Sequence, residues 1–274
     1  MRVHIVHGPK DARLNVTVAY DAIAADYDAQ VRGDDWMRRA LHAHYARVFR
    51  AGQRVLDVGC GTGIDAVALA RQGTHVLGVD GSAVMIAQLQ AKIVAERLDD
   101  WVEARVVRIQ ELPSLRNDRF DGIISAFASL NSLPDLTDFA TEAARLVRPG
   151  GRMVLHMLNR FSLWEWLGYA SRGNWPAARS VGQAHKRAFV IGGEAVQHSV
   201  YFAEEAYRRF FARDFARRAA YGLGALRPPH TVRRIPKSII FTLERLDVRL
   251  GGWPLLKDAG RFFVLDLERR TTYP

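Results

Sequence analysis

The sequence predicts a doubly wound α/β fold, in which helices cover both faces of a parallel sheet. Short β-rich runs alternate with helical stretches over residues 54–157, at the spacing of right-handed crossovers between parallel strands. The 274 residues are 49% hydrophobic and 25% charged, which is the composition of a globular protein with enough chain for one large domain and a cap. This balance excludes a disordered or collagen-like chain.

The first half of the chain shows a separate signal for each element. Apolar residues recur at helical spacing in 16–30 and 34–49, before any strand. Ser82 is the expected N-cap of a later helix, because its hydroxyl can accept a hydrogen bond from the first turn. The alternating part predicts strands at 54–58, 75–79, 104–108, 120–125 and 152–157, and helices at 64–71, 82–98 and 136–147.

After residue 158 the pattern changes, and the sequence predicts insertions that form a cap. Gly192 and Gly193 lie between two apolar stretches, which is the signal of a two-residue hairpin turn. The other expected elements are an aromatic helix at 161–172, a polar loop at 173–185, a helix at 203–215, a strand at 219–226, a helix at 237–250 and a final strand at 262–267. We therefore divide the chain into residues 1–158, with the leader helices and the ligand-binding core, and residues 159–274, which complete the sheet and carry a basic, aromatic-rich cap.

The net charge of +10 is unevenly distributed. Residues 1–150 hold 18 Lys and Arg against 19 Asp and Glu, whereas residues 151–274 hold 21 against 10. The basic second part suggests docking to something anionic, such as a carrier protein, a phosphorylated or carboxylated substrate, a lipid surface at the membrane periphery or RNA. The alternative is a set of solvated helix faces in a chain that prefers arginine, with 34 Arg against 5 Lys.

Other features narrow the compartment and the chemistry. No apolar run reaches the eighteen residues of a membrane span, and the first ten residues lack the pattern of a signal peptide, so we expect a cytoplasmic protein. The single cysteine, Cys60, excludes an internal disulfide framework and a multi-cysteine zinc site. We expect no metal.

Residues 55–63 form the most specific motif, a buried strand that leads into a glycine loop and then a helix. The glycines fall at 59, 61 and 63, and Ile64 stands where a dinucleotide fingerprint needs its third glycine. The Asp57 carboxylate at the strand end suits an ammonium or sulfonium group. Asp80, at the end of the second strand, can accept hydrogen bonds from both ribose hydroxyls of a nucleoside. Together these features describe S-adenosylmethionine.

On these residues the sequence resembles the class I S-adenosylmethionine-dependent methyltransferases, in particular the group that acts on small molecules. Further segments that support the resemblance are Val79-Asp80-Gly81-Ser82 with Met85, Glu111-Leu112-Pro113, Phe120-Asp121, and the segment from Leu146 to Gly151. The resemblance implies a Rossmann-like sheet of seven strands with an antiparallel last strand, and S-adenosylmethionine as the cofactor. The implied or expected cofactor contacts are Asp57, Gly59, Cys60, Gly61, Gly63, Asp80, Gly81, Met85, Ile109, Gln110, Ser125 and Phe127.

One segment departs from the family pattern. Such proteins usually carry an acidic residue followed by a small one after the third strand, to bind the adenine amino group. This chain has Arg108-Ile109-Gln110-Glu111 there. We expect the Ile109 backbone amide and the Gln110 side chain to hold the adenine instead.

The sequence indicates the residues that would contact the methyl acceptor less specifically than those that would contact the cofactor. His156 is the first candidate for a general base, although a histidine in an apolar strand can equally be a core residue, and His185 and His198 rank below it. Asn131 can orient an acceptor or serve as a turn residue. The expected substrate contacts are Tyr20 and Tyr27 in the lid, with Asn159 and Trp164 in the second part.

The sequence thus predicts methyl transfer to an oxygen or nitrogen of a small molecule, in specialised metabolism. The absence of an Asn/Asp-Pro-Pro-aromatic motif after the fourth strand argues against nucleic acid as the acceptor. Two alternatives stay open: an RNA methyltransferase, favoured by the charge, and a binding module that keeps the fold without catalysis.

Overall fold

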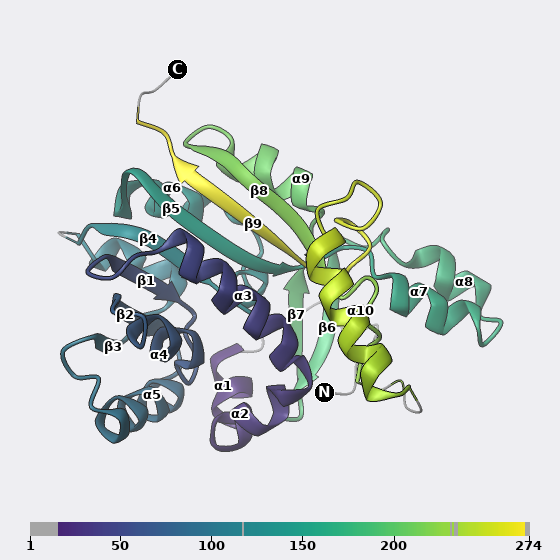
Figure 1. The fold of residues 1–274 in the computed structure, drawn as a ribbon, viewed down its shortest axis with the longest axis horizontal. Coiled ribbons are helices and arrows are strands. Elements are labelled where there is room, and N and C mark those ends of the chain that lie inside the picture. The colour runs from purple at the N-terminus through teal and green to yellow at the C-terminus, as the bar shows by residue number, and fades with distance from the viewer. Residues whose placement is uncertain (1–15, 117, 231, 233–234, 272–274) are drawn as a thin grey trace.

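The computed structural model describes residues 16–116, 118–230, 232 and 235–271. A seven-stranded sheet lies at its centre, in the order β3-β2-β1-β4-β5-β9-β8. Strands β1 to β5 pair in parallel, and β9 is antiparallel to both of its neighbours, β5 and β8 (Figure 1). The predicted fold class and the antiparallel last strand are therefore confirmed.

The strands and helices follow one another along the chain as the alternating pattern predicts. The strands are β1 (Arg54–Val58), β2 (His75–Asp80), β3 (Val102–Val106), β4 (Phe120–Ser125), β5 (Val147–Leu158), β6 (Lys186–Ile191), β7 (Glu194–Ser199), β8 (Phe215–Leu223) and β9 (Phe262–Arg269). The α-helices are α1 (Val16–Asp21), α2 (Tyr27–Gln30), α3 (Asp35–Val48), α4 (Ile64–Ala70), α5 (Ala83–Glu96), α6 (Thr137–Leu146), α7 (Leu163–Ala170), α8 (Trp175–Ser180), α9 (Ala203–Ala206) and α10 (Lys237–Leu250). Short 3₁₀ turns are η1 (Ala24–Asp26), η2 (Val31–Asp34), η3 (Ile109–Ser114) and η4 (Ser129–Ser132), and η5 (Tyr207–Phe211) is a π-helical turn.

Two apolar layers, one on each face of the sheet, hold the fold together. Alternate side chains of a strand point to opposite faces, so Leu155 of β5 joins the layer under α6 and η5, whereas Val154 joins the layer under α3, α4 and α5. The same alternation separates Leu265 from Val264 on β9. This arrangement leaves the carboxyl ends of the parallel strands free to form a site.

The structure corrects several predicted boundaries. The single leader helix predicted at 16–30 is divided into α1, η1 and α2. The polar loop predicted at 173–185 contains α8, which Asn174 caps by accepting a hydrogen bond from the Ala177 N–H. Strand β3 lies two residues earlier than predicted, β8 begins at Phe215 and not at 219, and the helix predicted at 203–215 ends at Phe211.

The cap consists of a hairpin and three helices inserted around the end of the sheet. Strands β6 and β7 form a separate two-stranded sheet, and both turn glycines, Gly192 and Gly193, have positive φ, as the predicted two-residue hairpin requires. The hairpin lies beside α1, whereas α7 and α8 project from one end of the molecule (Figure 1). In the described part of the chain, no helix is long and apolar enough to cross a membrane.

Several arginines of the second part form ion pairs within the fold. Arg208 and Arg217 both pair with Glu204, and Arg218 pairs with Glu268. Arg209 reaches back to an acid of the first part, Asp135, at 2.9 Å. Arg233 and Arg234 lie outside the described residues. Glu204 and Glu268 belong to the second part itself, so these pairs leave its basic excess in place, whereas the pair with Asp135 draws on an acid of the first part.

Candidate functional site

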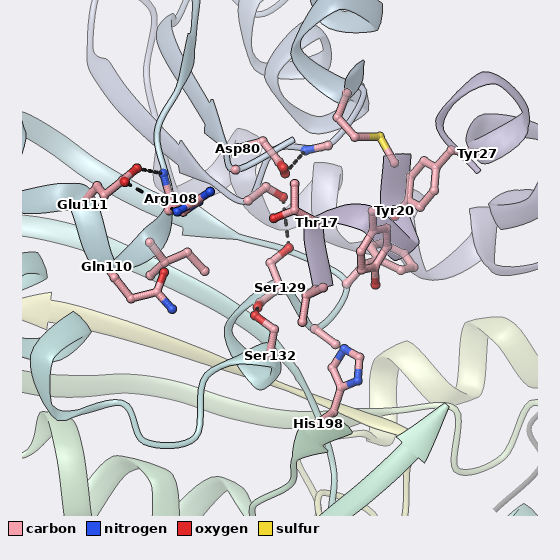
Figure 2. A pocket seen from close by; sticks show the side chains of 18 residues that line it. Thr17, Tyr20, Tyr27, Asp80, Arg108, Gln110, Glu111, Ser129, Ser132 and His198 are labelled. Atoms are coloured by element: carbon pink, nitrogen blue, oxygen red, sulfur yellow. Dashed lines mark hydrogen bonds and ion pairs between the residues drawn. The ribbon is translucent and has the colours of Figure 1, made fainter. Parts of the chain in front are cut away.

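A cavity of about 630 Å³ opens at the carboxyl ends of the parallel strands. Its wall combines five parts of the chain: the lid α1–α2, the glycine loop after β1, the turn after β2 with η3, the loop after β4, and β7 (Figure 2). The lining residues are Val16, Thr17, Tyr20, Tyr27, Gly59, Gly61, Asp80, Gly81, Met85, Arg108, Ile109, Gln110, Glu111, Phe127, Ala128, Ser129, Ser132 and His198. The volume is in the range of sites for small molecules and cofactors.

The glycine loop forms one side of the cavity because it can pack where side chains would not fit. Gly59 has a φ of +70°, and a Cβ there would lie 2.4 Å from the Ser129 Cβ. Gly63 has a φ of +79°, and its Cβ would lie 2.2 Å from Leu89 Cδ1. The N–H groups of Gly59 and Cys60 both donate to the Val79 carbonyl, at 2.8 and 3.0 Å. The backbone of Gly59 and Gly61 thereby lines the cavity.

Asp80 presents a pre-oriented carboxylate to the same cavity. Its Oδ2 accepts a hydrogen bond from the Gly61 N–H at 2.9 Å (Figure 2). Its Oδ1 accepts one from the Ser82 N–H, also at 2.9 Å. Burial raises the pKa of this carboxyl, and the backbone donors at Ser82 and Gly61 oppose that rise. Each oxygen keeps further acceptor capacity, so the group can receive two ligand hydroxyls.

Four of the predicted cofactor contacts lie behind the cavity wall. Asp57 is 1% exposed, and its Oδ2 has no hydrogen-bond partner among the described residues. Burial and the neighbouring Asp65 raise the pKa of Asp57 well above its usual value. The Ser125 hydroxyl donates to the Val58 carbonyl at 2.8 Å, and Cys60 and Gly63 also lie outside the lining. Asp57 and Ser125, at the ends of β1 and β4, point into the core and support the glycine loop on the side away from the cavity.

The segment after β3 forms another end of the cavity. Ile109 and Gln110 line it, as expected, together with Arg108 and Glu111 (Figure 2). The Glu111 carboxylate accepts a hydrogen bond from the Arg108 N–H at 2.9 Å, which fixes the start of η3. The predicted adenine contacts are therefore at the cavity, and their role in binding stays a prediction.

The lid helices are held to the glycine loop by two carboxylates. Asp28 of α2 accepts hydrogen bonds from Thr62 Oγ1 and from Lys92 Nζ, each at 2.5 Å. Asp21 of α1 accepts one from the Ser82 hydroxyl. The rings of Tyr20 and Tyr27 meet edge to face with centroids 6.3 Å apart, and both line the cavity. Burial raises the pKa of both phenols, so they stay protonated at neutral pH.

His156 lies in the core and not in the cavity wall. It is 1% exposed, its Nδ1 accepts a hydrogen bond from the Phe127 N–H at 3.2 Å, and its ring stacks on Phe262 at 4.4 Å. Burial lowers its pKa to about 3. This is the alternative that the sequence left open, a structural histidine, because β5 is a central strand covered on both faces.

The other three predicted acceptor-side residues also lie outside the cavity lining. Asn131 is fully buried, donating from Nδ2 to the Ser199 carbonyl at 2.6 Å and accepting from the Leu158 N–H at 3.0 Å. Asn159 is also fully buried, and its Nδ2 faces the Lys257 carbonyl at 3.4 Å. Trp164 belongs to α7. Asn131 and Asn159 therefore connect segments of the backbone.

Sequence reasoning missed several lining residues, including Thr17, Ser129 and Ser132, and gave His198 a lower rank than His156. His198 is 3% exposed and reaches the wall from β7. The sequence signal for this part of the cavity wall was the Gly192–Gly193 turn, which predicts the hairpin. It does not predict which face of each strand is turned toward the cavity.

Comparison with known proteins identifies the core that carries this geometry. Residues 55–151 match the family described as a methyltransferase domain. Over residues 55–151 the chain is thus similar to methyltransferase domains. The residues present fit S-adenosylmethionine as a cofactor: a glycine loop that a Cβ would obstruct, and a cavity-facing carboxylate held by two N–H groups.

Two sequence relatives each match less than half of this chain. The ubiquinone biosynthesis O-methyltransferase of Alkalilimnicola ehrlichii is 37% identical over 111 residues, which is 40% of this chain and 43% of that protein. The protein of the same name in Dechloromonas aromatica is 33% identical over 126 residues, 46% of this chain and 50% of that protein. The chain thus spans about half the length of these curated relatives or less.

Solved structures resemble nearly the whole chain in fold. The CcbJ methyltransferase from Streptomyces caelestis has a TM-score of 0.62 at 18% identity, over 93% of this chain and 99% of that one. A S-adenosylmethionine-dependent methyltransferase from Clostridium acetobutylicum has a TM-score of 0.59 at 13% identity, over 92% and 99%. The described cap is therefore compatible with the fold of a methyltransferase.

Proposed function

We propose that this protein is an enzyme that transfers the methyl group of S-adenosylmethionine to a hydroxyl oxygen of a small aromatic molecule. One observation carries the proposal: a single cavity joins the Asp80 carboxylate and glycine loop to a region lined by Tyr20, Phe127 and His198. The relatives are named ubiquinone biosynthesis O-methyltransferases, which favours oxygen over nitrogen as the atom that accepts the methyl group.

In the proposed mechanism, Asp80 holds the ribose hydroxyls and the backbone of Gly59 and Gly61 holds the methionine part. Ile109 and Gln110 hold the adenine. The bound cofactor supplies an electrophilic methyl group on a sulfonium. The chain has to align the acceptor oxygen with that methyl group and exclude water, and Tyr20 and Tyr27 of the lid perform this second task.

The acceptor that we propose is uncharged. The described residues at the His198 end of the cavity include hydroxyl and aromatic side chains but no cation, and Arg108 lies at the opposite end beside Glu111 (Figure 2). A carboxylated or phosphorylated acceptor would need a partner there. The place in specialised metabolism predicted from the sequence finds no support in the curated relatives, whose names belong to ubiquinone biosynthesis.

Calorimetry with S-adenosylmethionine and with its demethylated product tests the cofactor part of the proposal. We expect both to bind, and Asp80→Asn to weaken binding by about 10- to 100-fold, because a charge-assisted hydrogen bond contributes about 1.5–3 kcal/mol. Asp99→Asn, at an exposed carboxylate outside the cavity, is the matched control. Wild-type protein that binds neither compound would exclude the proposal.

Turnover with a panel of phenols separates an enzyme from a binding module. Methylation of a phenol supports the proposal, whereas cofactor binding without any methylated product contradicts it. RNA methylation is tested in parallel: methyl incorporation into RNA, with an affinity that falls steeply as salt increases, would favour that alternative.

A further inference from the structure

His198 is the one histidine among the described residues that line the cavity. It extends from β7 of the inserted hairpin, opposite the glycine loop and the Asp80 carboxylate (Figure 2). The hairpin lies outside the matched residues 55–151, and it thus contributes a proton-accepting group to the same space. The proposed reaction needs such a group, because a hydroxyl acceptor arrives protonated.

The surroundings of His198 keep its ring neutral and fixed. The Phe189 ring meets it edge to face at 5.2 Å, and Nδ1 is buried with no hydrogen-bond partner among the described residues. Burial lowers its pKa to about 4, opposed only by the Val196 backbone, with no charged side chain contributing. Nδ1 is closed off from solvent, which leaves Nε2 as the ring nitrogen for a ligand in the cavity. At neutral pH the ring is therefore neutral, with a lone pair on one nitrogen.

Contacts on both sides of His198 hold the hairpin in place. At the turn, the Gly192 backbone lies so close to α1 that a Cβ would come 2.5 Å from the Ala19 carbonyl oxygen. At the other end, Asn131 donates to the carbonyl of Ser199, the residue after His198, at 2.6 Å. The ring is thus presented by a segment clamped between the lid and the loop after β4.

The other titratable groups of the described cavity wall are poorer candidates for this task. Asp80 already accepts two backbone hydrogen bonds, and Glu111 accepts the Arg108 N–H. Tyr20 and Tyr27 stay protonated, because burial raises the pKa of both phenols. His198 alone combines a neutral acceptor nitrogen with a place in the wall.

We propose that His198 is the general base of the methyl transfer, a role that rests on the proposed function, and that the substrate is a phenol delivered with its hydroxyl toward Nε2. In this step Nε2 takes the hydroxyl proton and the imidazole becomes an imidazolium. The oxygen electron pair forms the C–O bond to the methyl carbon, and the pair of the broken C–S bond remains on sulfur. The imidazolium then loses its proton to solvent after the methyl ether leaves.

The test uses His198→Gln with two acceptors, catechol and 4-nitrophenol, at a pH where the nitrophenol is largely ionised and catechol is not. We expect a loss of about 10²- to 10⁴-fold in kcat for catechol, the usual contribution of a general base. The loss for the ionised nitrophenol should be only a few-fold, because it has no proton to give. Loss of packing alone would reduce both rates equally, and that result would overturn the proposal.

Two controls separate this proposal from the proposed function. His185→Gln removes an exposed histidine that precedes the same hairpin and lies outside the cavity lining, and it should keep wild-type rates with both acceptors. Calorimetry should give the same affinity of His198→Gln and wild type for the demethylated cofactor. If wild type binds the cofactor but methylates neither phenol, the phenol acceptor and the base role both fail while the cofactor site stands.

A measurement on wild type keeps the proposal falsifiable if His198→Gln does not fold. The titration of the His198 ring is followed by NMR in the folded protein. The acidic limb of kcat/KM for catechol should fall where this ring titrates, since only the neutral ring accepts the proton. A limb that occurs at a different pH would overturn the role of His198.

Discussion

Gly59 determines how closely the glycine loop approaches the loop after β4. Its φ of +70° is unfavourable for any residue with a Cβ, and the Ser129 Cβ and Oγ occupy the space that an added Cβ would need, at 2.4 and 2.6 Å. The Ser129 hydroxyl in turn donates to the Gly59 carbonyl at 3.0 Å. A side chain at residue 59 would therefore cause both backbone strain and overlap with Ser129.

We expect Gly59→Ala to lower the free energy of unfolding by about 3 kcal/mol, the combined cost of left-handed backbone and overpacking. Gly52→Ala is the matched control, because Gly52 has a φ of +81° with no heavy atom within 4 Å of an added Cβ. It should lose only about 1–2 kcal/mol. Urea unfolding measures both, and Ser129→Gly should restore part of the loss in Gly59→Ala. Equal losses at the two glycines would contradict this account.

At single positions, sequence reasoning succeeded where a local motif dictates geometry. The glycines at 59 and 61 and the carboxylate of Asp80 reach the cavity as predicted, because a strand end and the following turn place them there. For His156 it left a base and a core residue both open, since chain order shows that this residue is at the end of β5 but not that its side chain points into a layer sealed by Phe127 and Phe262. The position of His198 in the cavity wall depends on how the hairpin packs against the rest of the fold, and no local sequence pattern predicts that packing.

Among the elements, the lid is the part whose position depends most on polar contacts. Asp28 of α2 binds Thr62 on the glycine loop and Lys92 on α5, and its side chain is 44% exposed. Such an exposed pair contributes less than about 1 kcal/mol to stability, so its main effect is on where the lid lies. Tyr20 and Tyr27 move with it, and they cover the cavity.

We expect Asp28→Ala to leave the unfolding temperature nearly unchanged while raising the dissociation rate of S-adenosylhomocysteine by about 5-fold, which corresponds to about 1 kcal/mol. Stopped-flow displacement measures this rate. Asp26→Ala, at an exposed residue of the same lid for which the described residues provide no ion pair, is the control. An unchanged dissociation rate in Asp28→Ala would show that the lid does not depend on this contact.

Element prediction was accurate where burial imposes one period over the whole element. Strands β1 and β4 have the predicted bounds, since both are central strands that are buried along nearly their whole length. Helix α10 was also predicted at its bounds. Helix α8 was missed because its six residues include Pro176 and little apolar periodicity, and the leader helix was predicted as one piece because periodicity cannot show the turns within 22–26.

At the scale of the whole molecule, ion pairs join the two parts that differ in charge along the sequence. Charge counted along the chain does not show pairing across it, and the structure joins Arg209 to Asp135 and Arg261 to Asp34, each from opposite parts. The division at residue 158 runs through one sheet, as expected for a second part that completes the sheet, because β9 pairs with β5. Long-range pairing of this kind depends on the fold and not on local composition.

Two buried histidines, His156 of β5 and His198 of β7, contribute to the pH dependence of stability. Burial lowers the pKa of His156 to about 3 and that of His198 to about 4, below the ordinary value of 6.5. Between those values the unfolded chain binds protons that the folded chain does not. Their stabilising contribution is therefore complete above pH 6.5 and is lost as the pH falls toward about 4.

We expect His156→Gln to make the free energy of unfolding less dependent on pH below 6.5 than in wild type, by up to about 1.4 kcal/mol per pH unit. The glutamine amide can accept the Phe127 N–H in place of Nδ1, so the comparison concerns the slope and not the hydrogen bond. Urea unfolding at several pH values measures it. Combining His156→Gln with His198→Gln should reduce the slope further, since the two rings do not share a partner. Carboxylates contribute equally to both slopes and cancel in the difference, so an unchanged slope in the variant would mean that the His156 ring accepts a proton in the folded state.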